Sequence, residues 1–159
     1  MKYCGLNLCD TSNGPGCRVS LFVSGCTLHC KGCFNPDSWD FDKGEILNGR
    51  IIYTIINALE DPAIEGFSLL GGDPFEPEHE LKLSSLLRRI KHHYPNKTIW
   101  AWTGRTYDKI KESPLIEFID VLIDGPFILA KLDPNLKYRG STNQRILQLH
   151  PFKVITDGN

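Results

Sequence analysis

The cysteines of this 159-residue chain constrain its fold and chemistry more than any other feature. All six lie within the first 33 residues, and three of them form the pattern C-x-x-x-C-x-x-C. These three are Cys26, Cys30 and Cys33. A disulfide framework would distribute its cysteines along the chain, so this crowding indicates metal or redox chemistry. The spacing places three thiolates on one short loop, where they can bind one group together.

Three is an informative number of cysteine ligands. Electron-carrying iron–sulfur clusters are generally held by four cysteines, so three would leave one iron of a four-iron cluster open, as catalytic zinc keeps an open position. An open iron can bind the amino and carboxylate groups of a methionine moiety. The alternative is a structural zinc site, which typically uses paired C-x-x-C motifs or one motif with two histidines. Only His29 is nearby, but Cys4, Cys9 or Cys17 could supply a fourth ligand, so zinc stays an alternative. Otherwise we expect those three cysteines to be buried or incidental thiols.

The charge balance argues against a nucleic acid or an anionic membrane as partner. The chain carries 18 basic and 19 acidic residues, so it has no overall field to attract a polyanion. Residues 1–10 lack the features of a signal peptide, and no stretch approaches the roughly 18 apolar residues of a membrane span. With 41% hydrophobic residues, the sequence predicts one globular domain over residues 1–159, located in the cytoplasm.

Strand-like and helix-like segments alternate along most of the chain. Short apolar runs bounded by turn residues predict buried strands, and apolar residues at helical spacing predict helices. The predicted strands are 18–25, 66–70, 98–103 and 118–123, and the predicted helices are 46–60, 77–93 and 107–112. This alternation implies parallel strands joined by right-handed crossovers, whereas a closed barrel needs about 250 residues. We therefore predict an α/β fold, an incomplete TIM-like barrel with mainly parallel strands. Residues 133–159 show too little periodicity to place.

Several motifs give the chain a family resemblance. The three-cysteine motif and the sequence Gly71-Gly72-Asp73-Pro74 together resemble the two signature motifs of the radical S-adenosylmethionine superfamily. Further motifs resemble the activating proteins of anaerobic ribonucleoside-triphosphate reductases. They are NGPG at 13–16, LFVSGC at 21–26, WTG at 102–104, IDG at 123–125 and RGSTNQR at 139–145. The resemblance covers nearly the whole chain.

The resemblance implies two cofactors and the residues that bind them. Cys26, Cys30 and Cys33 would hold a 4Fe-4S cluster. The residues implied for S-adenosylmethionine are Gly32, Cys33, Phe34, Gly71, Gly72, Asp73 and Thr103. Gly71 and Gly72 would admit the methionine end to the backbone, and Asp73 would hold its amino group, which agrees with the chemistry of glycine and carboxylate. Residues 32–34 would lie against the adenine, and Thr103 would reach the ribose. Taken alone, Gly-Gly-Asp-Pro is more often a plain turn, and Thr103 suits a plain turn after a strand equally well.

By the same resemblance, the chain would be an enzyme that installs a glycyl radical on the large subunit of an anaerobic ribonucleoside-triphosphate reductase. A flavodoxin-like protein would donate the electron, and the chain would form a homodimer within a heterotetramer. A barrel this short leaves its opening uncovered, so we expect a partner surface to complete the site. Three alternatives stay open: an activating enzyme of another glycyl-radical enzyme such as pyruvate formate-lyase, a radical enzyme acting on a purine-like molecule, and a zinc-binding module without catalysis.

Overall fold

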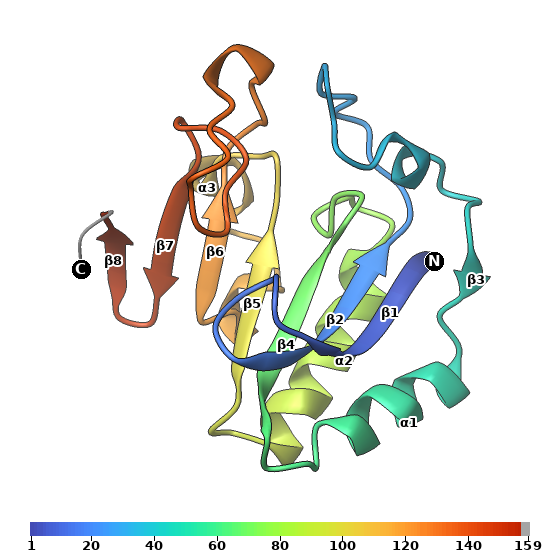
Figure 1. The fold of residues 1–159 in the computed structure, drawn as a ribbon. Helices are drawn as coiled ribbons and strands as arrows, with labels where there is room; N and C mark the ends of the chain where they lie inside the picture. The colour runs from blue at the N-terminus through green and yellow to red at the C-terminus, as the bar shows by residue number, and fades with distance from the viewer. Residues whose placement is uncertain (157–159) are drawn as a thin grey trace.

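The computed structural model describes residues 1–156, which form one open sheet with helices packed on it (Figure 1). The strands are β1 (Lys2–Asp10), β2 (Cys17–Val23), β3 (Glu45–Ile46), β4 (Ile64–Gly71), β5 (Thr98–Trp102), β6 (Val121–Asp124), β7 (Arg145–Leu149) and β8 (Phe152–Ile155). Their order in the sheet is β3-β1-β2-β4-β5-β6-β7-β8. The α-helices are α1 (Gly49–Ala58), α2 (Glu80–His93) and α3 (Tyr107–Ile110), and short 3₁₀ helices span Pro36–Trp39, Ile116–Phe118 and Leu129–Lys131.

The centre of the sheet is parallel and its two sides are antiparallel. Strands β2, β4, β5 and β6 pair in parallel, as the alternation predicts. The β1–β2, β1–β3, β6–β7 and β7–β8 pairs are antiparallel, so the expectation of mainly parallel strands holds for the central strands alone. For the β1–β2 and β7–β8 pairs the physical reason is loop length, since the connections at residues 11–16 and 150–151 are too short for the crossover that a parallel pair requires. The sheet does not close, and the partial TIM-like barrel stays a prediction.

The two faces of the central strands are chemically different, because successive side chains on a strand point to opposite faces. One face is apolar: Val19, Leu21, Phe67, Leu69 and Ile99 are fully buried in the main core, which also contains the inner sides of α1 and α2. Helix α1 begins after Asn48, whose side chain accepts a hydrogen bond from the Ile51 amide and caps the helix. The other face holds the cavity described below.

A buried arginine on this second face forms hydrogen bonds with β4 and β5. Arg18 is fully buried, and its guanidinium donates to the Ser68 hydroxyl at 2.7 Å and to the carbonyls of Phe67 and Thr98 at 2.9 and 2.8 Å. The Ser68 hydroxyl in turn donates to the Asn13 carbonyl at 2.6 Å. These bonds hold the β1–β2 connection across the front of the sheet, where Figure 1 shows it passing over β4 and β5. Burial lowers the pKa of Arg18 to about 10, so it stays a cation near neutral pH.

Four strands were not predicted, and one cysteine pair differs from expectation. Strands β1, β3, β7 and β8 lie in segments with weak patterning, and pairing with a neighbouring strand rather than side-chain alternation defines them.

In the β1–β2 hairpin, Cys9 and Cys17 lie 5.2 Å apart at their Cα atoms and form a disulfide. The expectation of incidental thiols is therefore wrong for these two, because it considered spacing along the chain and not hairpin pairing. Cys4 is free.

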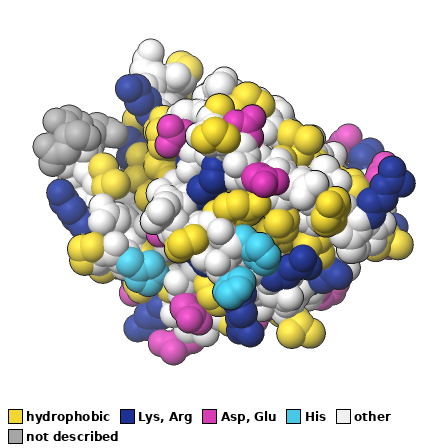
Figure 2. Space-filling model, turned by 90° about the horizontal axis from the view of Figure 1, so that it is seen from below, with side chains coloured by type: hydrophobic (Ala, Val, Ile, Leu, Met, Phe, Trp, Pro, Cys, Tyr) yellow, Lys and Arg dark blue, Asp and Glu magenta, His cyan; other side chains and the backbone are white. Residues whose placement is uncertain are grey.

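The end of the molecule opposite the strand-end loops shows no field of one sign. In Figure 2, which views this end, basic and acidic side chains are interspersed with apolar ones. This view agrees with the formal net charge of −1. Within residues 1–156, none of the helices combines the length and the hydropathy that crossing a bilayer requires.

Candidate active site

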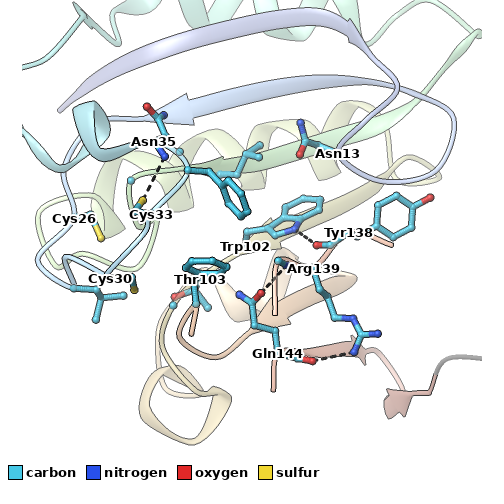
Figure 3. A pocket seen from close by; sticks show the side chains of 18 of the residues that line it. Asn13, Cys26, Cys30, Cys33, Asn35, Trp102, Thr103, Tyr138, Arg139 and Gln144 are labelled. Atoms are coloured by element: carbon cyan, nitrogen blue, oxygen red, sulfur yellow. Dashed lines mark hydrogen bonds between the residues drawn. The ribbon is translucent and has the colours of Figure 1, made fainter. Parts of the chain in front are cut away.

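The loops at the carboxyl ends of the central strands form the candidate site, as expected for parallel strands. The cysteine loop (residues 24–35) follows β2, the glycine turn (residues 71–74) begins at the last residue of β4, and residues 103–105 follow β5. The β6–β7 loop (residues 125–144) closes the side opposite the cysteine loop. Residues far apart in the sequence therefore meet at one edge of the sheet (Figure 3).

These loops enclose a cavity of about 710 Å³, a volume typical of a cofactor site. Most of the predicted site residues line it: Cys26, Cys30, Cys33, Phe34, Gly71, Gly72 and Thr103. Apolar side chains such as Leu28, Leu70 and Phe127 form much of the remaining wall. Two predicted residues, Gly32 and Asp73, are not part of the lining.

The three motif cysteines are all free and face this one cavity from a single loop. Cys26 is buried, and Cys30 and Cys33 are half-buried. The loop turns back on itself through left-handed backbone at His29 (φ 46°) and Gly32 (φ 76°), and the Cys33 amide donates to the Cys30 carbonyl at 3.1 Å. Burial raises the pKa of the Cys26 thiol, so Cys26 is protonated near neutral pH until a metal displaces the proton.

This donor set fits an iron–sulfur cluster. Within residues 1–156, no three His, Cys, Asp or Glu side chains converge on the position of one ion. A four-iron cluster has a different requirement, because each cysteine binds a different iron and the thiols surround the cluster rather than one point. Three free thiols around one cavity fit that requirement and would leave one iron without a protein ligand.

The glycine turn packs directly against the cysteine loop. The Gly72 amide donates to the Val23 carbonyl at 2.7 Å, and the Asp73 amide donates to the Gly25 carbonyl at 2.8 Å. A Cβ atom at Gly72 would lie 2.2 Å from the Gly25 oxygen, and Gly71 has a left-handed φ of 114°. The two glycines are therefore required for close contact between the two loops, in addition to any access that they give a cofactor.

Asp73 lies behind the residues that line the cavity. Its carboxylate is fully buried and accepts hydrogen bonds from the Phe75 amide at 2.9 Å and from the Thr103 hydroxyl, which lies 2.9 Å from both oxygens. The Arg105 Nε atom lies 3.5 Å from the same carboxylate. Burial raises the pKa of Asp73 to about 6 despite these contacts. In this arrangement, Asp73 holds the turn and Thr103 in place, and direct contact with a cofactor amino group stays a prediction.

Phe34 and Gly32 lie at the mouth of the cavity. The Phe34 side chain is 74% exposed and packs against Phe127 of the β6–β7 loop, with ring centroids 5.0 Å apart. Gly32 is exposed, and a Cβ atom there would lie 3.0 Å from the Leu129 side chain. Both residues therefore bring the cysteine loop against the β6–β7 loop, and their contact with adenine stays a prediction.

Sequence reasoning missed most of the wall opposite the cysteines, apart from the resemblance of residues 13–16 to a loop that closes near the active site. Asn13, Trp102, Tyr138, Arg139 and Gln144 line the cavity there, and Figure 3 shows them across from the three thiols. The Trp102 indole donates to the Tyr138 carbonyl at 2.8 Å, which ties the β6–β7 loop to the sheet. All five lie in the NGPG, WTG and RGSTNQR motifs or next to them, so these motifs were the sequence feature that could have identified them as site residues.

Comparison with known proteins places the chain among iron–sulfur proteins. A family model described as a 4Fe-4S single cluster domain matches residues 12–147. The chain is 43% identical over 158 residues to the anaerobic ribonucleoside-triphosphate reductase-activating protein of Haemophilus influenzae, an alignment that covers 97% of this chain and 100% of that protein. It is 39% identical to the protein of the same name from Enterobacteria phage T4, covering 92% and 93% of the two chains. The Escherichia coli protein of that name is 40% identical, covering 88% of this chain and 94% of its own length.

Proposed function

The chain belongs to the 4Fe-4S single cluster domain family, and on this premise we propose that it is the activating enzyme of an anaerobic ribonucleoside-triphosphate reductase. The observation that carries the proposal is the juxtaposition of the three free thiols and the glycine turn on one cavity. That arrangement suits a cluster with one open iron beside a second cofactor. The names of the relatives favour the reductase as partner over pyruvate formate-lyase.

The proposed chemistry uses S-adenosylmethionine as that second cofactor. One electron from the reduced cluster would cleave a carbon–sulfur bond of S-adenosylmethionine, releasing methionine, and the resulting 5′-deoxyadenosyl radical would take a hydrogen atom from a glycine of the reductase. The chain itself supplies position and shielding. Cys26, Cys30 and Cys33 would hold the cluster, the backbone of the glycine turn would receive the methionine end, and Thr103 would lie beside the cofactor at the cavity wall.

Exclusion of water is the second task of the chain. Leu28, Leu70, Phe127 and Trp102 line the cavity with apolar surface, which protects a reactive intermediate from side reactions. A partner glycine would approach from the exposed side of the cavity, where Phe34 lies. The flavodoxin-like donor, the homodimer within a heterotetramer and the cytoplasmic location stay predictions from the sequence, as does the absence of a nucleic-acid partner.

Electron paramagnetic resonance on anaerobically reconstituted, reduced protein tests the proposal. We expect a reduced-cluster signal that changes when S-adenosylmethionine is added, and a glycyl-radical signal when the purified reductase is also present. The Cys30→Ala variant should lose both signals and its iron. Cys4→Ala removes a free thiol that lies outside the motif and should behave as wild type.

Two results would contradict the proposal. Tightly bound zinc without a cluster would favour the binding-module alternative. A cluster that responds to S-adenosylmethionine while leaving the reductase without a radical would favour another glycyl-radical enzyme or a small-molecule substrate.

A further inference from the structure

Three of the loops around the cavity are tied together by an ionic network, centred on a buried carboxylate, that the motifs do not predict. Glu76 lies just after the glycine turn, Arg105 follows β5, and Thr27 is the residue after Cys26. Their side chains meet behind the cavity lining, next to Asp73. The network thus connects the loop that carries the cysteines to the loops after β4 and β5.

Glu76 is the centre of this network. Its side chain is only 3% exposed, and its Oε1 atom accepts hydrogen bonds from the Thr27 amide and the Thr27 hydroxyl, both at 2.8 Å. Burial alone would raise the pKa of Glu76, but the bonds from Thr27 and the charge of Arg105 outweigh burial and lower it. Glu76 is therefore ionised near neutral pH, and its hydrogen bonds to the cysteine loop are charge-assisted, which makes them stronger than neutral ones.

Arg105 extends the connection to the next two strands. Its Nη2 atom donates to the Glu76 carboxylate at 2.7 Å, and its Nε atom lies 3.5 Å from the Asp73 carboxylate. Its backbone carbonyl accepts a hydrogen bond from the Gly125 amide at 2.9 Å, at the turn after β6. One cation thus balances two buried carboxylates and links the loops after β4, β5 and β6.

Through Thr27, the network anchors the cysteine loop at a point between Cys26 and the other two motif cysteines. Thr27 separates Cys26, which is buried, from the more open part of the loop that carries Cys30 and Cys33. A bond to the backbone at this residue fixes where the exposed part of the loop begins. The glycine turn contacts the same loop one step earlier, through the Asp73 amide and the Gly25 carbonyl. Hydrogen bonds at Gly25 and at Thr27, one on each side of Cys26, therefore hold the cysteine loop against the glycine turn.

We propose that Glu76 and Arg105 form a latch that positions the cysteine loop against the glycine turn. Neither residue lines the cavity, so both are positioning residues that act through Thr27 and Asp73. The latch sets the geometry in which the cluster and the second cofactor meet. This consequence rests on the proposed function, whereas the latch itself is a property of the protein without cofactors.

Hydrogen–deuterium exchange on the cofactor-free protein tests the latch directly. In Glu76→Ala, exchange should accelerate in peptides that cover residues 25–34, because the Thr27 amide loses its acceptor, while peptides from α1 and β5 keep their wild-type rates. Arg105→Ala should show a smaller effect in the same peptides. Glu78→Gln removes an exposed carboxylate two residues away and is the matched control, with no change expected.

A second measurement follows the reduced-cluster spectrum as S-adenosylmethionine is titrated. Glu76→Ala should retain its iron and sulfide but need about 10 to 100 times more S-adenosylmethionine for half of the spectral change, since coupling between two sites in a protein typically changes affinity by a factor of that order. Glu76→Gln keeps an oxygen acceptor for Thr27 and loses the charge, so it should fall between Glu76→Ala and wild type.

The outcomes separate this inference from the proposed function. Unchanged exchange at residues 25–34 in Glu76→Ala would overturn the latch, and so would acceleration spread over the whole chain, which would show that Glu76 only supports the fold. Faster exchange at the loop together with wild-type S-adenosylmethionine titration would also overturn its positioning role. If the wild-type cluster did not respond to S-adenosylmethionine, the proposed function would fail, while the exchange data would still decide whether the latch exists.

Discussion

The buried carboxyl group of Asp73 should give the protein a measurable pH dependence of stability. Burial raises the pKa of Asp73 from 3.8 to about 6, in spite of the hydrogen bonds from Phe75 and Thr103 and the charge of Arg105. Because the folded state holds the proton more tightly than the unfolded state, protonated Asp73 stabilises the fold below about pH 4, and that contribution is lost as the pH rises through about 6. A difference of about two pKa units corresponds to about 3 kcal/mol in total.

The Asp73→Asn variant isolates this contribution, because asparagine has a similar shape and does not titrate. We expect the free energy of unfolding of the variant, relative to wild type, to increase by about 2 kcal/mol between about pH 4.5 and about pH 7.5. The measurement is urea denaturation of the cofactor-free, reduced protein at several pH values. The exposed Glu78→Gln variant is the control and should show a difference from wild type that changes little with pH.

The difference between Asp73→Asn and wild type is the decisive quantity. A difference that stays constant over this pH range would mean that the Asp73 pKa is close to its ordinary value. A difference of the opposite sign, with wild type gaining stability relative to the variant as the pH rises, would mean that the Arg105 charge outweighs burial and that the pKa is lowered. Either result would refute the reasoning from burial.

Three further substitutions test other parts of the structure. Arg18→Lys should lower the free energy of unfolding by about 3 kcal/mol, measured by urea denaturation, because a lysine cannot reach all of the carbonyl and hydroxyl oxygens that the guanidinium satisfies. Asn48→Ala should lower the free energy of unfolding by about 1 kcal/mol in the same assay, because α1 loses its N-terminal cap. Asn57→Ala, which changes an asparagine within α1 that does not cap the helix, is the control. Thr103→Val removes a hydrogen bond to ionised Asp73 and should raise the pKa of Asp73 further. The pH at which half of the Asp73 contribution to the free energy of unfolding is lost should therefore be higher than in wild type. An unchanged midpoint pH would argue against that hydrogen bond.

The sequence was sufficient for the parts of the site that are local. Three cysteines within eight residues identify a ligand loop in any fold, because their spacing alone keeps the thiols together. The glycine turn is also a local feature, and the structure shows why glycine is needed there, since a Cβ atom at Gly72 would collide with the Gly25 carbonyl. The central parallel strands were predictable for the same kind of reason, because apolar runs and helical spacing are properties of short segments.

The tertiary structure decided what depends on partners far away in the chain. Glu76 bonds to Thr27 across 49 residues and to Arg105 across 29 residues, and no periodicity links such positions. The direction of the Asp73 side chain, the Cys9–Cys17 pairing and the wall formed by the β6–β7 loop depend in the same way on how the strands are arranged. The sequence by itself therefore determined which groups could bind a cluster, because short spacing fixes their proximity. Only the tertiary structure decided what holds those groups in position, because packing and burial select the partners of each charge.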